Sequence, residues 1–239
     1  MRWYWNSENG NEEAAKFQKA FPTLALEFER NTHSACVRGV LPITPNIGYT
    51  VSLKLPSNYP KGIPTLWIAR NEIPWLADRH INEASGEGCL CVRSEYRLHW
   101  PIGSDLATFI DRLVRPYFAA QLFYETHGYW PKNAARSHGK DGIIEAYREL
   151  SIPFGNDSSQ IIENLMRLLA RKGPPKGHEL CPCGSGLRLR NCHFDVLQRL
   201  RNNIAPEHAK ADLEMMFPSI PRENERRDSH FLVRSNRMK

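Results

Sequence analysis

Long hydrophobic runs are missing from this chain, and cysteine is scarce. No apolar stretch approaches the roughly 20 residues that a membrane-spanning helix needs, and the N-terminus lacks the apolar core of a signal peptide. Six cysteines in 239 residues are too few for a fold held together by disulfides. We therefore expect a cytoplasmic protein that neither spans a membrane nor is secreted, in which clustered cysteines bind metal or act as nucleophiles.

Composition and charge set further limits. The chain is 41% hydrophobic and 24% charged, as globular domains are, and its length fits one domain of about 150 residues with an appendage. The formal net charge of +6 permits a nucleic-acid partner but does not require one. Part of the excess lies in residues 222–239, which carry six Lys or Arg and three Asp or Glu. We interpret this stretch as a solvated basic tail.

Hydrophobic periodicity predicts an α+β fold. Strong helix formers over residues 12–20 are followed by four alternating segments, at 24–29, 35–41, 49–55 and 65–69, that we expect to form an antiparallel meander. Residues 71–102 hold no period for long, which in a compact domain suggests a functional loop. Further helices are expected at 104–123, capped by Ser104 and kinked at Pro116, at 142–150, after a cap at Asp157, and at 195–204 and 207–217.

Four candidate metal ligands lie within thirteen residues near the C-terminus: Cys181, Cys183, Cys192 and His193. Three thiolates and one imidazole form a tetrahedral set typical of structural zinc. A segment this short has almost no core, so we expect the metal to hold it together. The cluster resembles the SEC-C motif, with its Cys-x-Cys, eight residues, then Cys followed by His. That resemblance implies a structural zinc with no free coordination position, and a role in protein recognition.

A second set of residues is informative through its order. It comprises Tyr59-Pro60 with Pro64, His80-Ile81-Asn82, the Gly-x-Gly-Cys-Leu sequence of residues 86–90, and Trp100-Pro101. Over residues 12–150 this order resembles the ubiquitin-conjugating-enzyme core, which runs helix, four-stranded meander, extended active-site stretch and helices. The chain departs from that pattern in three places. Ile81 replaces the Pro of the His-Pro-Asn triad, and the loop from Asn82 to Cys89 is one residue short. Trp100 is followed directly by Pro101, where the family has a Trp-x-Pro-like element.

The resemblance implies a cysteine-dependent acyl transferase. Cys89 would carry a partner's C-terminus as a thioester, because sulfur is intrinsically nucleophilic and accepts acyl groups. Asn82 would stabilise the oxyanion or hold the loop, and His80 would fix the loop rather than remove a proton. Gly86 and Gly88 would let the incoming tail pass close to the backbone. The bacterial relatives of this kind belong to CBASS anti-phage operons, which implies a cyclic-nucleotide synthase (CD-NTase) as the carried protein.

Several alternatives remain open at this point. Cys91 lies two residues from Cys89 and competes as nucleophile, and the two thiols could bind a metal together with His80 or His99. A non-catalytic adaptor could use the same fold and its zinc knuckle, and a Cys/His hydrolase is a weaker hypothesis.

The predicted domain organisation has four parts. Residues 1–150 form the ubiquitin-conjugating-like catalytic domain, and residues 151–178 a helix with a Gly/Pro linker. Residues 179–195 form the SEC-C-like zinc module, and residues 196–239 a helical region with the basic tail. The oligomeric state does not follow from the sequence.

Overall fold

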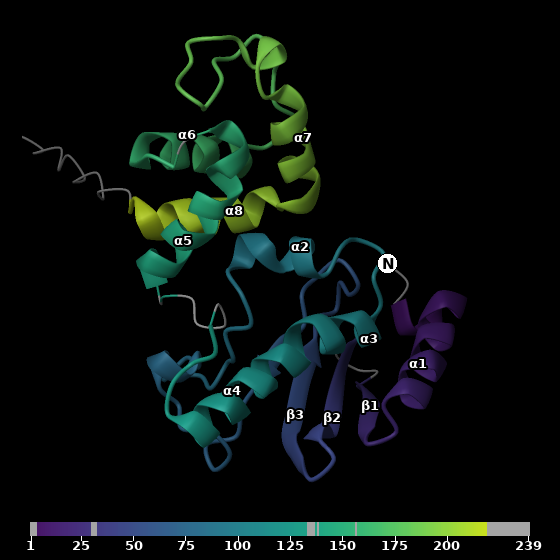
Figure 1. Ribbon diagram of the computed structural model, residues 1–239. Coiled ribbons are helices and arrows are strands. Elements are labelled where there is room, and N and C mark those ends of the chain that lie inside the picture. The colour runs from purple at the N-terminus through teal and green to yellow at the C-terminus, as the bar shows by residue number, and fades with distance from the viewer. Residues whose placement is uncertain (1–3, 30–32, 133–136, 138, 156, 219–239) are drawn as a thin grey trace, which may run out of the picture.

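A four-stranded antiparallel sheet lies at the centre of the N-terminal half of the molecule (Figure 1). The computed structural model describes residues 4–29, 33–132, 137, 139–155 and 157–218. The strands follow one another in sequence order: β1 (Leu24–Glu29), β2 (Ser34–Thr44), β3 (Ile47–Leu55) and β4 (Thr65–Trp67). The predicted meander is confirmed, and its last strand is shorter than expected.

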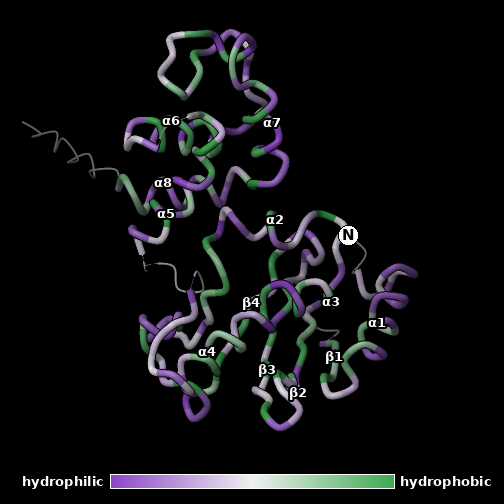
Figure 2. Tube along the Cα trace, in the orientation of Figure 1, coloured by the Kyte–Doolittle hydropathy of each residue, from purple (hydrophilic) through white to green (hydrophobic). Residues whose placement is uncertain are grey.

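The sheet has one buried and one solvated face, as the alternating sequence predicts. In β3 every second residue from Tyr49 to Leu55 is buried, while Thr50 and Lys54 between them are exposed. Figure 2 shows the hydrophobic residues along β3 and β4. The buried face packs against Phe109 and Phe118 from the helices that cross it, which forms the first hydrophobic cluster of the molecule.

Helices cover the buried face and one edge of the sheet (Figure 1). Helix α1 (Glu8–Ala20) begins one turn earlier than expected, because Ser7 caps it by accepting a hydrogen bond from the Gly10 amide at 3.2 Å. The crossing segment comprises α3 (Leu106–Phe109), a π-helical stretch η4 (Ile110–Val114) and α4 (Arg115–His127). Its N-cap is Asp105 and not Ser104, since the Asp105 carboxylate accepts from the Thr108 amide at 2.8 Å.

The π-helical stretch changes which residues of α4 face the core. Each π turn accommodates an additional residue, so positions after it rotate relative to a regular helix. Regular helical spacing along this segment predicts a buried apolar stripe that includes Ala120 and Phe123. These two residues are half-buried, whereas Phe118 and Gln121 are fully buried. Pro116 directly follows the π-helical stretch, in the first turn of α4.

A second hydrophobic cluster forms the C-terminal half of the molecule. It contains α5 (Gly139–Ser151), α6 (Ser159–Ala170), α7 (Phe194–Asn203) and α8 (Pro206–Met216), together with Cys181 and Leu189 of the cysteine-rich segment. The N-cap of α6 is Ser158 and not Asp157. The cluster starts at Ile143, so apolar packing groups α5 with the C-terminal helices. The four-part domain division, with its first boundary at residue 150, stays a prediction.

Short elements connect the two halves. The stretch between β4 and α3 contains η2 (Ala77–Arg79), η3 (Arg93–Glu95) and α2 (Tyr96–His99), and η3 contacts α8. Shorter 3-10 turns occur at η1 (Tyr4–Asn6), η5 (Ile152–Phe154) and η6 (Leu189–Asn191). In the described part of the chain, no helix combines the length and the apolar character needed to cross a bilayer. The predicted basic tail at residues 222–239 lies outside the described residues.

Candidate functional site

A cavity of about 910 Å³ lies where the two halves meet. Its walls include His80, Asn82 and Cys89, the three candidate catalytic residues, and also Cys91. Helix α4 contributes Tyr117 to the lining. The structure thus brings together the residues that were selected from the sequence, and the Cys89 side chain lies at the wall of the cavity.

A small hairpin carries Cys89 at its end. Ile81 and Gly88 form an antiparallel bridge, and the Gly88 amide donates to the Leu66 carbonyl of β4 at 2.9 Å. The Cys89 amide then donates to the His80 carbonyl at 2.8 Å. The hairpin therefore extends the sheet beyond β4 and fixes the backbone of the nucleophile candidate to that of His80.

The glycines of the hairpin serve its own packing. Gly86 has φ +77°, and a Cβ there would lie 2.2 Å from the Trp75 ring. The Trp75 indole is held in place by donating to the Ile68 carbonyl at 2.9 Å. A Cβ on Gly88 would lie 3.3 Å from the Leu66 side chain. The expectation that these glycines leave room for an incoming tail is wrong, because side chains of the protein occupy that space.

The Cys89 side chain is exposed, while Cys91 is half-buried and packs on the first hydrophobic cluster. Crowding by the cavity walls raises the pKa of the Cys89 thiol above its ordinary value. The nearby Glu87 carboxylate raises this pKa further, and the Arg93 guanidinium opposes both effects. Cys89 is accessible, but at neutral pH the thiol predominates over the thiolate.

Asn82 organises the hairpin turn through its side chain. Its amide oxygen accepts hydrogen bonds from the backbone amides of Ala84 and Ser85, each at 3.0 Å. This is an Asx turn, a common use of asparagine in loops. Of the two roles considered for Asn82, the structure shows the loop-holding one, and the side chain remains exposed at the cavity.

His80 has an unusual backbone conformation, with φ +53° in the left-handed region. Its ring meets the edge of the Trp130 ring, with 5.3 Å between centroids. Left-handed backbone in a residue other than glycine costs free energy and persists only where neighbouring contacts enforce it. His80 therefore lies at a point where surrounding contacts determine the loop's shape.

The opposite wall of the cavity comes from the C-terminal helices, which no sequence pattern connected with the site. Helix α5 contributes Ile143 and Glu149, and α8 contributes Asp212 and Met215. Asp212 is 3% exposed and accepts from the Tyr147 hydroxyl at 3.3 Å. Burial raises the pKa of this carboxyl. The sequence feature that could have indicated this wall is Asp212, an acidic residue on the apolar side of the helix predicted at residues 207–217.

Two of the residues that carried the family resemblance are core residues. Trp100 is fully buried and donates from its indole to the Asp105 carbonyl at 2.9 Å. Tyr59 is 4% exposed, stacks on Trp5 and donates from its hydroxyl to Glu13. Both residues brace the loops that flank the cavity from inside the first cluster, and neither lines the cavity itself.

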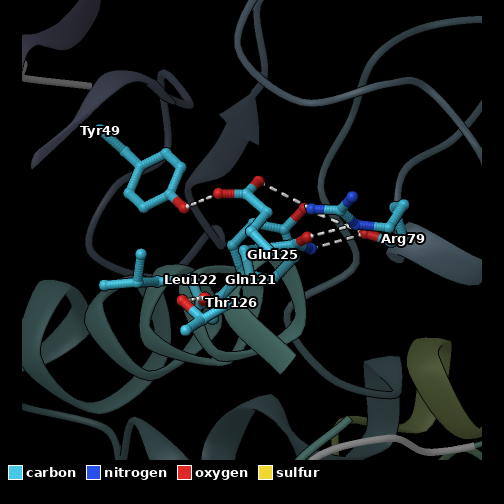
Figure 3. Close-up of polar contacts among 7 residues, drawn as sticks. Tyr49, Arg79, Gln121, Leu122, Glu125 and Thr126 are labelled. Atoms are coloured by element: carbon cyan, nitrogen blue, oxygen red, sulfur yellow. Dashed lines mark hydrogen bonds and ion pairs between the residues drawn. The ribbon is translucent and has the colours of Figure 1, made fainter. Parts of the chain in front are cut away.

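A charged network lies beside His80, and its Arg79 is buried while its Glu125 is exposed (Figure 3). Arg79 is 8% exposed and donates to Gln121 and to the Glu125 carboxylate, each at 2.8 Å. The other oxygen of Glu125 accepts from the Tyr49 hydroxyl at 2.6 Å. This network was not predicted from the sequence. The sequence feature that could have indicated it is Gln121, which lies four residues after Tyr117 on the core-facing side of the helix, where an apolar residue would be expected.

The cysteine-rich segment brings its four predicted metal ligands together. The ligand atoms of Cys181, Cys183, Cys192 and His193 all lie within 4.8 Å of one another. The two thiols of Cys183 and Cys192 are 3.6 Å apart, and the Cys181 sulfur lies 3.3 Å from the His193 Nδ1. Donors around a tetrahedral zinc ion lie roughly 3.5 to 3.8 Å apart, given the usual Zn–S and Zn–N distances. The donor set is therefore compatible with zinc.

Backbone hydrogen bonds shape this segment around the ligands. The Cys181 amide donates to the Leu187 carbonyl at 2.9 Å, and the Leu189 amide donates to the Glu179 carbonyl at 2.7 Å. Burial raises the pKa of the Cys181 thiol to about 12. A bound cation would oppose this burial effect, because metal coordination favours the thiolate. Cys181 is thus a group that burial alone keeps protonated and that a metal would deprotonate.

Comparison with protein-family models matches residues 179–195 to the SEC-C motif. The matched residues include all four members of the Cys/His cluster. Comparisons with curated proteins and with solved structures gave no match. The chain therefore combines a mixed α/β structure, built on a four-stranded antiparallel sheet, with a C-terminal SEC-C motif whose Cys/His cluster is compatible with zinc binding.

Proposed function

We propose that this protein is a ubiquitin-conjugating-like acyl transferase that carries the C-terminus of a partner protein as a thioester on Cys89. One observation carries the proposal: His80, Asn82 and Cys89, chosen for their order in the sequence, line one cavity with the Cys89 side chain exposed. The order of the elements supports it as well. A helix, a four-stranded meander, an irregular stretch and further helices follow one another as in the ubiquitin-conjugating core.

The chemistry proceeds in two steps. In loading, the Cys89 sulfur attacks an activated acyl carbon of the partner, an S–C bond forms, and the activating group leaves while the thiol proton passes to solvent. In transfer, an amine attacks the thioester, a C–N bond forms, the C–S bond breaks so that sulfur leaves as the thiolate, and the amine nitrogen loses one proton to solvent. A second protein supplies the activated acyl group.

The partner of this proposal is a CBASS cyclic-nucleotide synthase, carried by a cytoplasmic conjugating protein in anti-phage defence. The resemblance of residues 12–150 to bacterial ubiquitin-conjugating-like proteins supports this choice. The SEC-C motif supports a structural zinc module that takes part in protein recognition, because all four of its ligand positions come from the protein.

A non-catalytic adaptor is the second candidate function. Two features of the site favour it. The crowding cavity walls and Glu87 both disfavour the thiolate of the accessible Cys89 side chain, and the Asn82 amide oxygen already accepts the hydrogen bonds of the turn. An adaptor would use the cavity to hold a partner segment without forming a covalent bond.

Co-expression with the neighbouring genes, followed by non-reducing gels and mass spectrometry, distinguishes these functions. The transferase predicts a partner adduct on Cys89 that excess thiol cleaves, and an uncleavable adduct in Cys89→Lys. Cys89→Ala should abolish the adduct, and Cys91→Ala should leave it largely intact. An adduct on Cys91 would identify the other cysteine as nucleophile. If neither cysteine is modified and Cys89→Ala keeps full biological activity, the adaptor function is correct.

A further inference from the structure

Gln121 holds both the side chain and the backbone of Arg79. Its amide oxygen accepts from the Arg79 Nε at 2.8 Å, and its amide NH₂ donates to the Arg79 carbonyl at 2.7 Å. The Tyr117 hydroxyl also donates to that carbonyl, at 3.4 Å. Gln121 has no exposed surface, so water cannot replace either bond. One peptide group is thus fixed from helix α4 by two side chains.

That peptide group is connected directly to the nucleophile candidate. It links Arg79 to His80, which holds its left-handed conformation at φ +53°. The carbonyl of His80 in turn accepts from the Cys89 amide at 2.8 Å. The path from Gln121 to Cys89 therefore runs through two hydrogen bonds and a single intervening residue, His80, and both His80 and Cys89 line the cavity.

We propose that Gln121 is a positioning residue, which through Arg79 and His80 fixes the backbone of Cys89 so that its thiol points into the cavity. The inference rests on the proposed transferase function and assigns a role that the sequence did not suggest. Gln121 suits this role better than an apolar residue, because only a side chain with both a donor and an acceptor can hold Arg79 at two points. Glu125 provides the compensating charge for Arg79.

The expected effect is on rate rather than on partner binding. Displacement of a reacting group by about 1 Å can cost a reaction about a hundredfold. Gln121→Met removes both hydrogen bonds with little change in volume, so we expect single-turnover loading of Cys89 to slow by about tenfold or more. The partner concentration that gives half-maximal loading should stay unchanged, because the exterior of α4 is unaltered.

Three further variants separate positioning from a loss of stability. Gln121→Glu keeps the acceptor for Arg79 but removes the donor to its carbonyl, so it should also slow loading. Tyr49→Phe removes the hydroxyl at the far end of the same network, and Thr126→Ala removes an exposed hydroxyl of α4 that donates to the Leu122 carbonyl at 2.8 Å (Figure 3). Both of these controls should load at the wild-type rate, even where the melting temperature of Tyr49→Phe falls to that of Gln121→Met.

The outcomes are distinct. Slower loading in both Gln121 variants with an unchanged half-saturating concentration, alongside normal loading in Tyr49→Phe, supports the inference. Normal loading in Gln121→Met, or an equal defect in Tyr49→Phe, overturns it. If Gln121→Met does not fold, Gln121→Glu and its controls decide.

Alkylation of Cys89 by iodoacetamide tests the inference without any partner. A released loop should change the rate of alkylation severalfold in Gln121→Met but not in Tyr49→Phe, and equal rates in all variants would overturn the positioning role. Should wild-type protein form no thioester with any co-expressed partner, the proposed function fails, while this measurement still decides the role of Gln121.

Discussion

At the scale of single residues, the thiol of Cys89 is accessible but not activated. Its side chain is exposed, yet the surrounding walls and the Glu87 carboxylate both raise its pKa. Reactive cysteines in other proteins commonly have a lowered pKa because a cation or a helix N-terminus stabilises the thiolate. Among the groups that shift the pKa of Cys89, Arg93 is the only cation, and its lowering effect is smaller than the combined raising effects of the cavity walls and Glu87. In the proposed transferase, the reactivity of Cys89 would therefore depend on groups that the proposed partner brings to the site.

Two charged neighbours of Cys89 should change its alkylation rate in opposite directions when they are neutralised. Because Glu87 raises the pKa of Cys89 and Arg93 lowers it, Glu87→Gln should speed alkylation at mildly basic pH, and Arg93→Gln should slow it. The rate should follow the thiolate fraction and level off only above the ordinary thiol pKa of about 8.5. The measurement is the rate of iodoacetamide modification as a function of pH, in a Cys91→Ala background with the modified peptide identified by mass spectrometry.

The alkylation rates of the Cys91→Ala parent and of its Glu87→Gln and Arg93→Gln variants should converge at high pH, where Cys89 is fully ionised in all three proteins. Shifts of the same sign in Glu87→Gln and Arg93→Gln would contradict this account, because only a change in accessibility would act in that way. Melting curves of the variants provide the control for local unfolding.

At the scale of elements, the hairpin before Cys89 depends on one glycine. Gly86 combines a left-handed φ of +77° with contact to the Trp75 ring, whereas Gly128 has the same φ of +77° and a Cβ there would meet nothing within 4 Å. The two glycines thus separate backbone strain from steric overlap. The strain is common to both positions, and the overlap is confined to Gly86.

Substitution of these glycines by alanine should differ in cost. Gly128→Ala should lower the free energy of unfolding by about 1 kcal/mol, the cost of a left-handed alanine. Gly86→Ala should cost about 3 kcal/mol, because the ring of Trp75 must also move. Urea denaturation of both variants checks the difference. Equal costs would show that Trp75 yields easily and that the hairpin does not depend on its packing.

Sequence patterns predicted the elements better than their details. The alternation in residues 49–55 gives a strand that buries Val51 and Leu53, because period two can be met only by a half-buried strand. The buried face of α4 was not predicted, since a regular helix was assumed, and the π-helical stretch at Ile110–Val114 rotates the residues that follow it. The caps Asp105 and Ser158 were each missed by one residue, where neighbouring side chains could cap equally well.

Only those residues of the candidate site that lie close together in the sequence could be predicted. Cys89, Asn82 and His80 come from one short stretch, and the hairpin that holds them is local. The α5–α8 wall and Gln121 depend on contacts between distant parts of the chain, which no local pattern records. The four metal ligands were predicted because their spacing alone determines how the segment can close.

At the scale of the whole molecule, the loop after Cys89 lies between two hydrophobic clusters. Leu90 and Cys91 pack on the first cluster, and Val92 packs on the second. The second cluster also contains Cys181, with Cys183 and Cys192 packed against it. The metal-ligand segment and the far wall of the Cys89 cavity therefore share one apolar core, although they are remote in sequence.

This arrangement predicts that zinc removal affects the Cys89 cavity while sparing the sheet. Purified protein should contain about one zinc per chain, and a chelator or Cys181→Ser should remove it. The small metal-binding segment lacks a core of its own, so loss of the metal should unfold this segment and loosen the second cluster. The cavity wall formed by α5 and α8 should then be less well supported. Alkylation of Cys89 should then become faster in both cases.

The tryptophans make the two clusters separately measurable. All six tryptophans precede residue 131, and Trp5 and Trp100 lie in the first cluster. In a Trp130→Phe background, which removes the tryptophan that lines the Cys89 cavity, tryptophan fluorescence should stay native in metal-free protein, while helical content, much of which belongs to α5–α8, should fall. Adding chelator to Cys181→Ser should change nothing further, which excludes an effect of the chelator itself. Native helical content and unchanged Cys89 reactivity in protein shown to lack zinc would mean that apolar packing holds the second cluster without the metal.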